Sequence, residues 1–303
     1  MGEDTARVAG VVSSDVGTRK LQWSWSENTR KLALDGVTDP SLKSWFSTIR
    51  AVVFCPEDIA IVRAEPGLRR RFIDRAAFTL RPGHLSLVQD YSKILRHKVA
   101  LLKSRASESQ RSTFDTELAR VGARLMVRRC EAISALIDPL NEIHSCIAGQ
   151  GTVRLKLRSA GGVDSDQSEE DLRRALEESI SAKSQEELMR GQALVGPHRD
   201  ELEIYIDDKL ARSYASQGQA RSVVLALKLA QWSAAGAGGE PPLFLLDDLG
   251  SELDGHRRAR LLELLGDLPG QVWVTTTDPG FVDAVPADER QLHRVDSGRI
   301  TPD

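Results

Sequence analysis

Four consecutive apolar residues followed by two carboxylates constrain this chain more than any other stretch. Leu243 to Leu246 predict a short buried strand, and Asp247 and Asp248 stand where that strand ends. Open α/β sheets carry their ligand chemistry at the carboxyl ends of their strands. A first Asp there can hold Mg²⁺, which takes oxygen ligands, and a second acid can orient or deprotonate a water. A solvated acidic turn is the alternative, and the acid pair alone does not decide between the two.

The neighbouring segments favour a ligand site. Ser216–Arg221 reads as the start of a helix that continues through the apolar residues Val223–Ala230. Free N–H groups and the helix dipole make such a start an anion site. Downstream of the acids, Ser251–Asp254 reads as a turn, and Gln271–Asp278 predicts another buried strand that ends in hydroxyls and a carboxylate. The order is therefore anion-binding helix, acid-tipped strand, turn and hydroxyl-tipped strand.

These segments resemble the C-terminal half of an ATPase head of the ATP-binding-cassette type. Ser216–Arg221 is similar to the signature motif, Leu243–Asp248 to the Walker B strand and Ser251–Asp254 to the D-loop. The resemblance narrows to the RecF family, recombination-mediator ATPases related to SMC heads. Three further stretches carry it: Phe54–Ile59, Arg69–Asp74 and Leu194–Asp200. The match runs in order from about residue 5 to the C-terminus.

The resemblance implies a fold and a set of roles. The fold is an α/β head of the ABC/SMC type, incomplete at its N-terminus, with an inserted antiparallel helical-hairpin arm called lobe II. Two such heads sandwich ATP and Mg²⁺, with Asp247 at the metal and catalytic position and Asp248 at the position of the catalytic base. The residues expected to bind the nucleotide or couple the two sites are Ser216, Gly218, Gln219, Arg221, Ser251, Asp254 and Thr277.

Three parts are expected along the chain. Residues 1–65 read as a strand meander of the head, residues 66–147 as the arm and residues 148–303 as the rest of the head. Within the arm, apolar residues recur at spacings of three and four over Pro82–Leu102 and Phe114–Ile143, which predicts two helices packed on each other.

Charge adds a nucleic-acid hypothesis. The whole chain has a net charge of −3, but residues 61–130 hold 16 basic and 6 acidic side chains, a net charge of +10. A basic segment on an acidic protein is typical of nucleic-acid contact, although a solvated arm explains it equally well. A predicted helix over Pro66–Phe78 carries the candidate phosphate ligands Arg69, Arg70, Arg71 and Arg75. Pairing of Arg70 or Arg71 with Asp74 is the alternative.

One motif of the family is missing. The chain has no Gly-Lys dipeptide, so the phosphate-cradling loop G-x-x-x-x-G-K-[ST] is absent. The chain is therefore expected to be either an N-terminally incomplete copy or a variant that has lost ordinary ATP binding. Whether it is an enzyme stays open.

The resemblance also implies a function. It is that of a cytoplasmic DNA repair, replication and recombination protein that binds single-stranded and double-stranded DNA, gap junctions and ATP. ATP would drive formation of a homodimer, which supports recombinase loading with mediator proteins and the SOS response. The alternative is a DNA- or partner-binding protein that does not hydrolyse ATP. A chromosome-organising SMC head is disfavoured because the arm is short. No apolar run approaches 18 residues, so no membrane span is expected.

Overall fold

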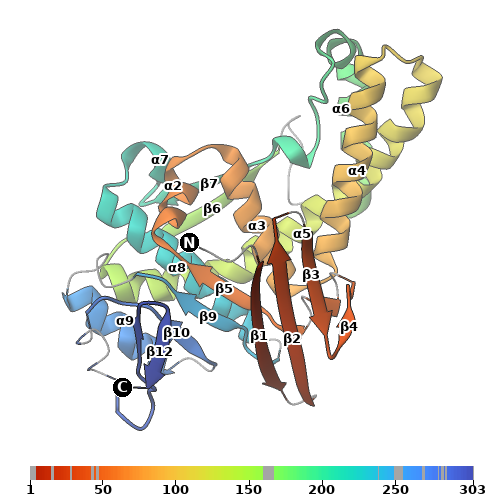
Figure 1. Cartoon of the computed structure of the whole chain (residues 1–303). Helices are drawn as coiled ribbons and strands as arrows, with labels where there is room; N and C mark the ends of the chain where they lie inside the picture. The colour runs from red at the N-terminus through yellow and green to blue at the C-terminus, as the bar shows by residue number, and fades with distance from the viewer. Residues whose placement is uncertain are drawn as a thin grey trace.

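A head and a projecting helical arm make up the chain (Figure 1). The computed structural model describes residues 5–14, 17–27, 29–41, 44–45, 48–159, 167–237, 239–248, 255–267, 270–278, 280, 283 and 285–302. None of the helices in these ranges is long and apolar enough to cross a membrane.

Within these ranges, the strands form three sheets and a terminal hairpin. An antiparallel sheet has the order β1 (Thr5–Ser14), β2 (Gly17–Ser26), β3 (Thr29–Leu34) and β4 (Val37–Thr38). A parallel sheet has the order β10 (Val272–Val274), β9 (Leu243–Leu246) and β5 (Ala51–Phe54). The third sheet contains β6 (Val153–Arg158), β7 (Glu201–Ile206) and β8 (Lys209–Leu210), and the hairpin contains β11 (His293–Asp296) and β12 (Arg299–Pro302). The strand predicted at Leu243–Leu246 is confirmed.

The helices connect and cover these sheets. Those of the first half are η1 (Pro56–Ile59), α2 (Ala60–Arg63), α3 (Pro66–Leu80), α4 (His84–Lys103) and α5 (Glu108–Ala148). Those of the second half are α6 (Glu169–Arg190), η2 (Pro197–Arg199), α7 (Ala211–Tyr214), α8 (Gln217–Gly236) and α9 (Gly255–Asp267). Pro66 stands at the first position of α3, where its missing N–H and fixed φ suit a helix start.

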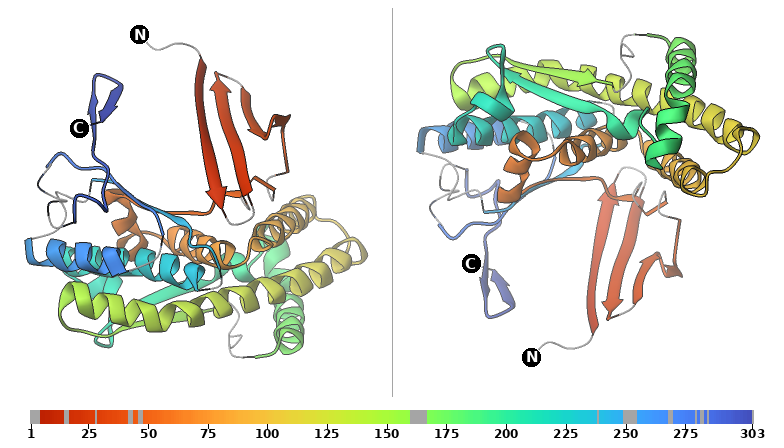
Figure 2. Two further views of the ribbon diagram at one scale, coloured as in Figure 1. Left: turned by 90° about the horizontal axis from the view of Figure 1, so that it is seen from below. Right: turned by 90° about the horizontal axis from the view of Figure 1, so that it is seen from above.

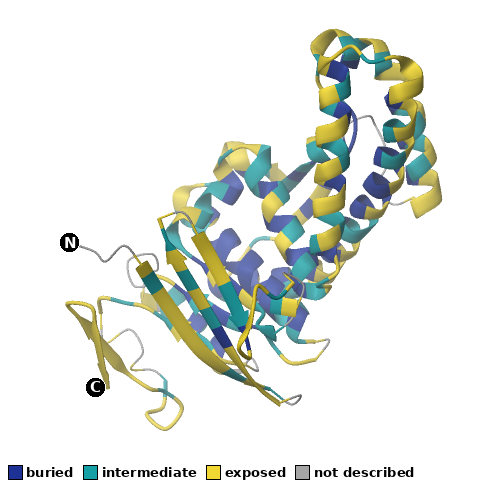
Figure 3. Ribbon diagram, turned by 45° about the vertical axis from the view of Figure 1, so that its right-hand side comes forward, coloured by how far each residue is buried: buried dark blue, intermediate teal, exposed yellow. Residues whose placement is uncertain are grey.

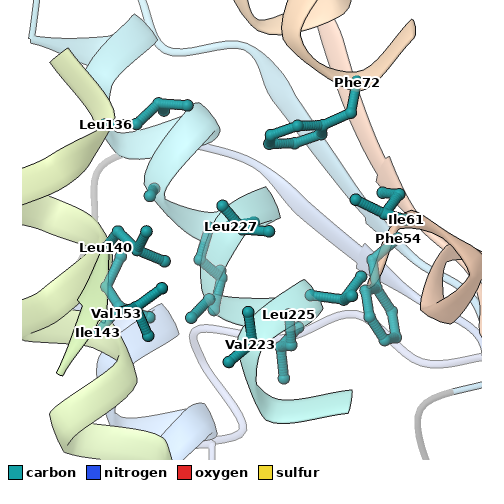
Figure 4. Close-up of a cluster of buried hydrophobic side chains, with 14 of the residues drawn as sticks. Phe54, Ile61, Phe72, Leu136, Leu140, Ile143, Val153, Val223, Leu225 and Leu227 are labelled. Atoms are coloured by element: carbon teal, nitrogen blue, oxygen red, sulfur yellow. The ribbon is translucent and has the colours of Figure 1, made fainter. Parts of the chain in front are cut away.

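The core of the head surrounds α8. This helix is apolar on nearly all sides, which is typical of a helix buried between two layers. It packs against the parallel sheet and against α5 (Figure 4). The rings of Trp232 on α8 and Phe244 on β9 stack with centroids 5.1 Å apart. The C-terminal half of α8 is therefore packed against β9, the strand that carries the two acids.

Within the described residues, the arm contains the predicted pair of helices and a third helix beside them. The predicted pair is present as α4 and α5, and α6 packs against them. Leu172, Leu176 and Ile180 recur every four residues on one face of α6 and are buried against α5. The expected boundary at residue 148 therefore differs from the structure, because the chain returns to the head through β6 and then re-enters the arm (Figure 1).

A buried network of charges joins the arm to the head. Arg129 of α5 is 3% exposed and donates from Nε and Nη2 to the carboxylate of Asp74 on α3, each at 2.9 Å. Its Nη1 donates to Asp200 at 2.9 Å and to the carbonyl oxygen of Pro197 at 2.7 Å. His84 Nε2 lies 3.1 Å from Asp74 Oδ1. One guanidinium thus connects α5 to α3 and to the loop before β7.

This network predicts a dependence of stability on pH. Burial raises the pKa of Asp74, but Arg129 and His84 outweigh it and lower that pKa to about 2. A carboxylate with a depressed pKa contributes stability above its unfolded pKa and loses it as the pH falls through the folded value. We expect the free energy of unfolding to fall between about pH 5 and pH 2, and to fall less in Asp74→Asn. Urea unfolding at pH 5 and pH 2.5 measures both; an equal fall in the two proteins would contradict the prediction.

Candidate nucleotide site

The start of α8 is open to an anion. Ser216 is the N-cap, and its Oγ accepts a hydrogen bond from the Gln219 backbone N–H at 3.2 Å. The Gln219 side-chain oxygen accepts in return from the Ser216 N–H at 2.9 Å. Both residues are exposed. Arg257 of α9 lies beside this turn. The Nη1 atom of Arg257 would be 3.5 Å from a Cβ atom placed on Gly218. The helix dipole and this guanidinium give the turn a positive potential.

The two acids lie at the carboxyl end of the parallel sheet, as predicted. The Asp247 N–H donates to the carbonyl oxygen of Phe54 on β5 at 2.9 Å, which fixes the backbone where β9 ends. Thr275, directly after β10, donates from its hydroxyl to Asp247 Oδ1 at 2.5 Å. The same hydroxyl oxygen accepts from the Asp248 N–H at 3.1 Å. One threonine thus orients both acidic residues.

Sequence reasoning singled out Thr277 and missed Thr275. The parallel register pairs Val274 with Leu246. The residues that follow these two, Thr275 and Asp247, are therefore neighbours. Thr277 lies two residues further along and is exposed. The signal that would have found Thr275 is the pairing register, which the run of three threonines does not reveal.

The donor set at this edge fits Mg²⁺. Asp247 and Asp248 are exposed and offer carboxylate oxygens, the ligand type that Mg²⁺ prefers. In the part of the chain that the structure describes, no group of three or more His, Cys, Asp or Glu side chains could hold a metal ion. Mg²⁺ keeps several waters and takes one or two carboxylates together with phosphate oxygens, so two acids suffice for it.

The remaining predicted nucleotide residues have different surroundings. Arg221 lies one turn inside α8 and is half-buried. Ser251 and Asp254 lie outside the described residues. Beyond that gap, Arg258 of α9 forms an ion pair with Asp278 at 3.2 Å, which ties α9 to the segment after β10.

Among the residues that the structure describes, helices cover one face of the parallel sheet and leave the other exposed. Cross-strand pairing places Trp273, Leu245 and Val53 in one row on the face away from α8. Trp273 is 59% exposed and Val53 is 43% exposed. Parallel sheets normally bury both faces, so this face has the composition of one that packs against a further layer.

The four arginines of α3 separate into two kinds. Arg69 is 2% exposed and forms an ion pair with Glu201 and a hydrogen bond to the carbonyl oxygen of Ala64. Arg70 donates to the carbonyl oxygen of Asp200 at 2.7 Å. Arg71 and Arg75 are exposed. The prediction of a nucleic-acid contact is therefore corrected for Arg69, whose buried guanidinium serves the fold.

The alternative reading of these arginines is also resolved. Asp74, considered as a helix partner for Arg70 or Arg71, instead pairs with Arg129 and His84 from other helices. Its position on α3 faces the arm junction. Arg71 and Arg75 thus remain candidates for phosphate contact.

The fold and this site together define an ATPase head of the ABC/SMC type. Its distinguishing features are an open helix start, a strand that ends in two acidic residues, and an arm inserted between the two halves of the head. Heads of SMC proteins share the fold: the Smc head domain with a coiled coil and joint from Pyrococcus yayanosii matches with a TM-score of 0.56 at 11% identity, over 99% of this chain and 82% of that one.

Among heads of this type, the chain belongs to the RecF family. It is 36% identical over 304 residues to the DNA replication and repair protein RecF of Anaeromyxobacter sp. (strain Fw109-5). These residues make up 99% of this chain and 82% of that protein. It is 38% identical over 275 residues to RecF of Geobacter sulfurreducens, covering 90% of this chain and 75% of that protein. No protein-family model matches the sequence. The solved structure of the recombination mediator protein RecF with ATP matches with a TM-score of 0.87 at 26% identity, over 99% of this chain and 80% of that one.

Proposed function

We propose that this RecF-type DNA replication and repair protein binds ATP with Mg²⁺ and that the nucleotide joins two copies through the face that carries the start of α8. The observation that carries the proposal is the Asp247–Thr275–Asp248 cluster at the carboxyl end of β9. A relative in the family has been solved with ATP. The dimer would act on single-stranded, double-stranded and gapped DNA in the cytoplasm, support recombinase loading with mediator proteins and contribute to the SOS response.

Each residue of the site has a chemical role in this proposal. Asp247 would hold Mg²⁺, which when bound neutralises charge on the phosphate oxygens. Asp248 would orient the attacking water and accept its proton. Ser216, Gly218 and Gln219 would present the positive helix end to the phosphates held by the second copy. Thr275 is a positioning residue, because it reaches the nucleotide only through the two acids.

A second candidate function has its own support. The parallel sheet has the exposed apolar row that includes Trp273, and such a patch is typical of a protein-binding surface. The alternative function is that of a protein that binds DNA or a partner head and hydrolyses nothing, with this row as the surface for the partner. The first experiment is therefore to measure binding of a fluorescent ATP analogue, with Mg²⁺, to the chain as given and to a version extended upstream in frame.

The outcomes separate the two functions. Binding by either form, abolished by EDTA, supports the nucleotide proposal, and binding by the extended form alone assigns the missing loop to the extension. Absence of binding in both forms contradicts the ATP proposal and leaves the non-hydrolysing function.

The positioning role of Thr275 gives a sharper prediction. Thr275→Val keeps the size of the side chain but removes the hydroxyl that holds Asp247. Loss of an outer-shell partner weakens metal affinity by about 10- to 100-fold, so we expect the Mg²⁺ concentration for half-maximal nucleotide binding to rise by about that factor in the form that binds nucleotide. Thr113→Val, at an exposed threonine of α5 in the arm, is the control and should leave it unchanged. Equal effects of the two substitutions would rule out the assigned role.

A further inference from the structure

The antiparallel sheet β1–β4 projects from the rest of the head as a separate blade (Figure 2). Its two faces differ in chemistry, because residues paired across the strands share a face. Val8, Trp23 and Leu32 form one apolar row across three strands. The next row along the strands, on the opposite face, consists of Arg7, Ser24 and Lys31. The blade thus has an apolar face and a polar face.

The polar face combines cations with hydroxyl groups. Its rows contain Arg7, Ser24 and Lys31; Thr5, Ser26 and Thr29; Ala9, Gln22 and Ala33; Val11 and Lys20; and Ser13 and Thr18. The three cationic residues are exposed, and the blade is predominantly exposed in Figure 3. The residues that pair across the strands on this face include no Asp or Glu. An anion meets cations and hydrogen-bond donors here without a carboxylate between them.

A hollow of about 540 Å³ lies at one end of this face. Six of the residues that line it belong to the polar face, namely Thr5, Arg7, Ser24, Ser26, Thr29 and Lys31, and the other two are Ala6 and Trp25. Arg7 donates to the Gln22 side-chain oxygen at 2.5 Å, and the Ser26 and Thr29 hydroxyls lie 2.7 Å apart. The hydroxyls and cations therefore converge on one concave surface.

We propose that the polar face of β1–β4 binds the phosphodiester backbone of double-stranded DNA. This inference rests on the proposed DNA-binding function and assigns to it a surface separate from Arg71 and Arg75. Strands lie about 4.8 Å apart, which places the backbones at Arg7 and Lys31, two strands from each other, about 10 Å apart. DNA carries one phosphate per about 3.4 Å of axis on each strand, so the two cations can reach different phosphates. Side-chain hydroxyls are common phosphate donors.

The surroundings of the cations distinguish this face from an ordinary solvated one. The surface of α6 is an example of an ordinary solvated face, because its cations pair with neighbouring acids: Arg173 pairs with Glu170 and Glu177. Within the described residues, the ion pairs include none for Lys20 or Lys31. Asp35, in the turn after β3, is engaged with Arg19 and with the Lys20 backbone N–H, and Glu27 lies in the turn after β2. Acids thus stand at the turns and cations on the strands.

The test compares two neighbouring residues of β3. Lys31 belongs to the polar face, whereas Arg30 pairs with Trp25 on the apolar face. Both are exposed. Binding to a fluorescein-labelled 30-base-pair duplex would be followed by anisotropy between 50 and 200 mM salt. Since each phosphate contact contributes about 0.9 to the slope of log K against log salt, we expect Lys31→Ala to lower the slope by about 1 and Arg30→Ala to leave it unchanged.

A triple variant and a control separate the outcomes. Arg7→Ala/Lys20→Ala/Lys31→Ala should lower the slope by about 2 to 3. If the triple variant binds like the unsubstituted chain while Arg71→Ala/Arg75→Ala does not, the surface is wrong and the DNA-binding function stands. If Lys31→Ala and Arg30→Ala weaken binding equally, only net charge matters and the inference fails. If the unsubstituted chain binds no DNA, both proposals fail. The single substitutions keep the test valid should the triple variant fold poorly.

Discussion

Replacing Arg129 by Met is expected to lower the free energy of unfolding by about 3–5 kcal/mol, the range seen when one partner of a buried ion pair is removed. Met fills much of the same volume, so little of the loss comes from packing. The loss comes from the half-buried Asp74 and the fully buried Asp200, which would both lose their shared counter-charge. Burial already raises the pKa of Asp200 in spite of the nearby guanidinium. Urea unfolding followed by far-ultraviolet circular dichroism measures the change.

Arg124→Met is the matched control, because Arg124 lies on the same helix and is exposed. A surface substitution of this kind typically changes stability by less than about 0.5 kcal/mol. The double variant Arg129→Met/Asp74→Asn should lose less than the sum of the two single variants, since the residues share one network. Additive losses, or a loss below about 1 kcal/mol in Arg129→Met, would show that the network does not hold the arm to the head.

Much of the fold could be predicted because its signals are local. The apolar run at Leu243–Leu246 predicted β9. The start of α6 has a signal of the same local kind, since Ser168 precedes three acids and its side chain accepts from the Asp171 N–H. The turn between β7 and β8 is also local, since Asp207 and Asp208, a residue type that tolerates positive φ, have φ values of 47° and 62°. Such signals depend on residues close in sequence.

The contacts that position the site depend instead on distant residues. Arg128 and Arg129 are adjacent in sequence, yet only Arg129 faces Asp74, which is 55 residues away. From the sequence, Arg69 and Arg71 were equal candidates for phosphate contact. In the structure, Arg69 is buried and pairs with Glu201, which is 132 residues away. Thr275 and Thr277 differ only through the register of β10 against β9. In each case the sequence shows which residue types are present, and tertiary packing decides which of two similar residues makes the contact.

The arm itself contains a second buried charge cluster, and Lys98→Met is expected to lower its stability by about 3–5 kcal/mol. Lys98 of α4 is 1% exposed, and its Nζ lies 2.7 Å from Asp115 on α5 and 2.7 Å from Glu187 on α6. Glu187 also accepts from the Leu194 N–H at 2.7 Å. One ammonium therefore connects all three helices, and without it Glu187 would be a buried, unpaired charge.

Native-state hydrogen exchange can assign this loss to the arm. Amides of α4 and α6 should exchange at a lower opening free energy in Lys98→Met, while those of α8 in the head keep their protection unless the whole chain unfolds as one unit. Lys93→Met, an exposed position on the same helix, is the control. Adding Glu187→Gln to Lys98→Met should recover part of the loss, because it removes the unpaired charge. If Lys98→Met instead leaves the arm as stable as before, apolar packing has replaced the ion cluster, and the three helices are held together by their hydrophobic seam alone.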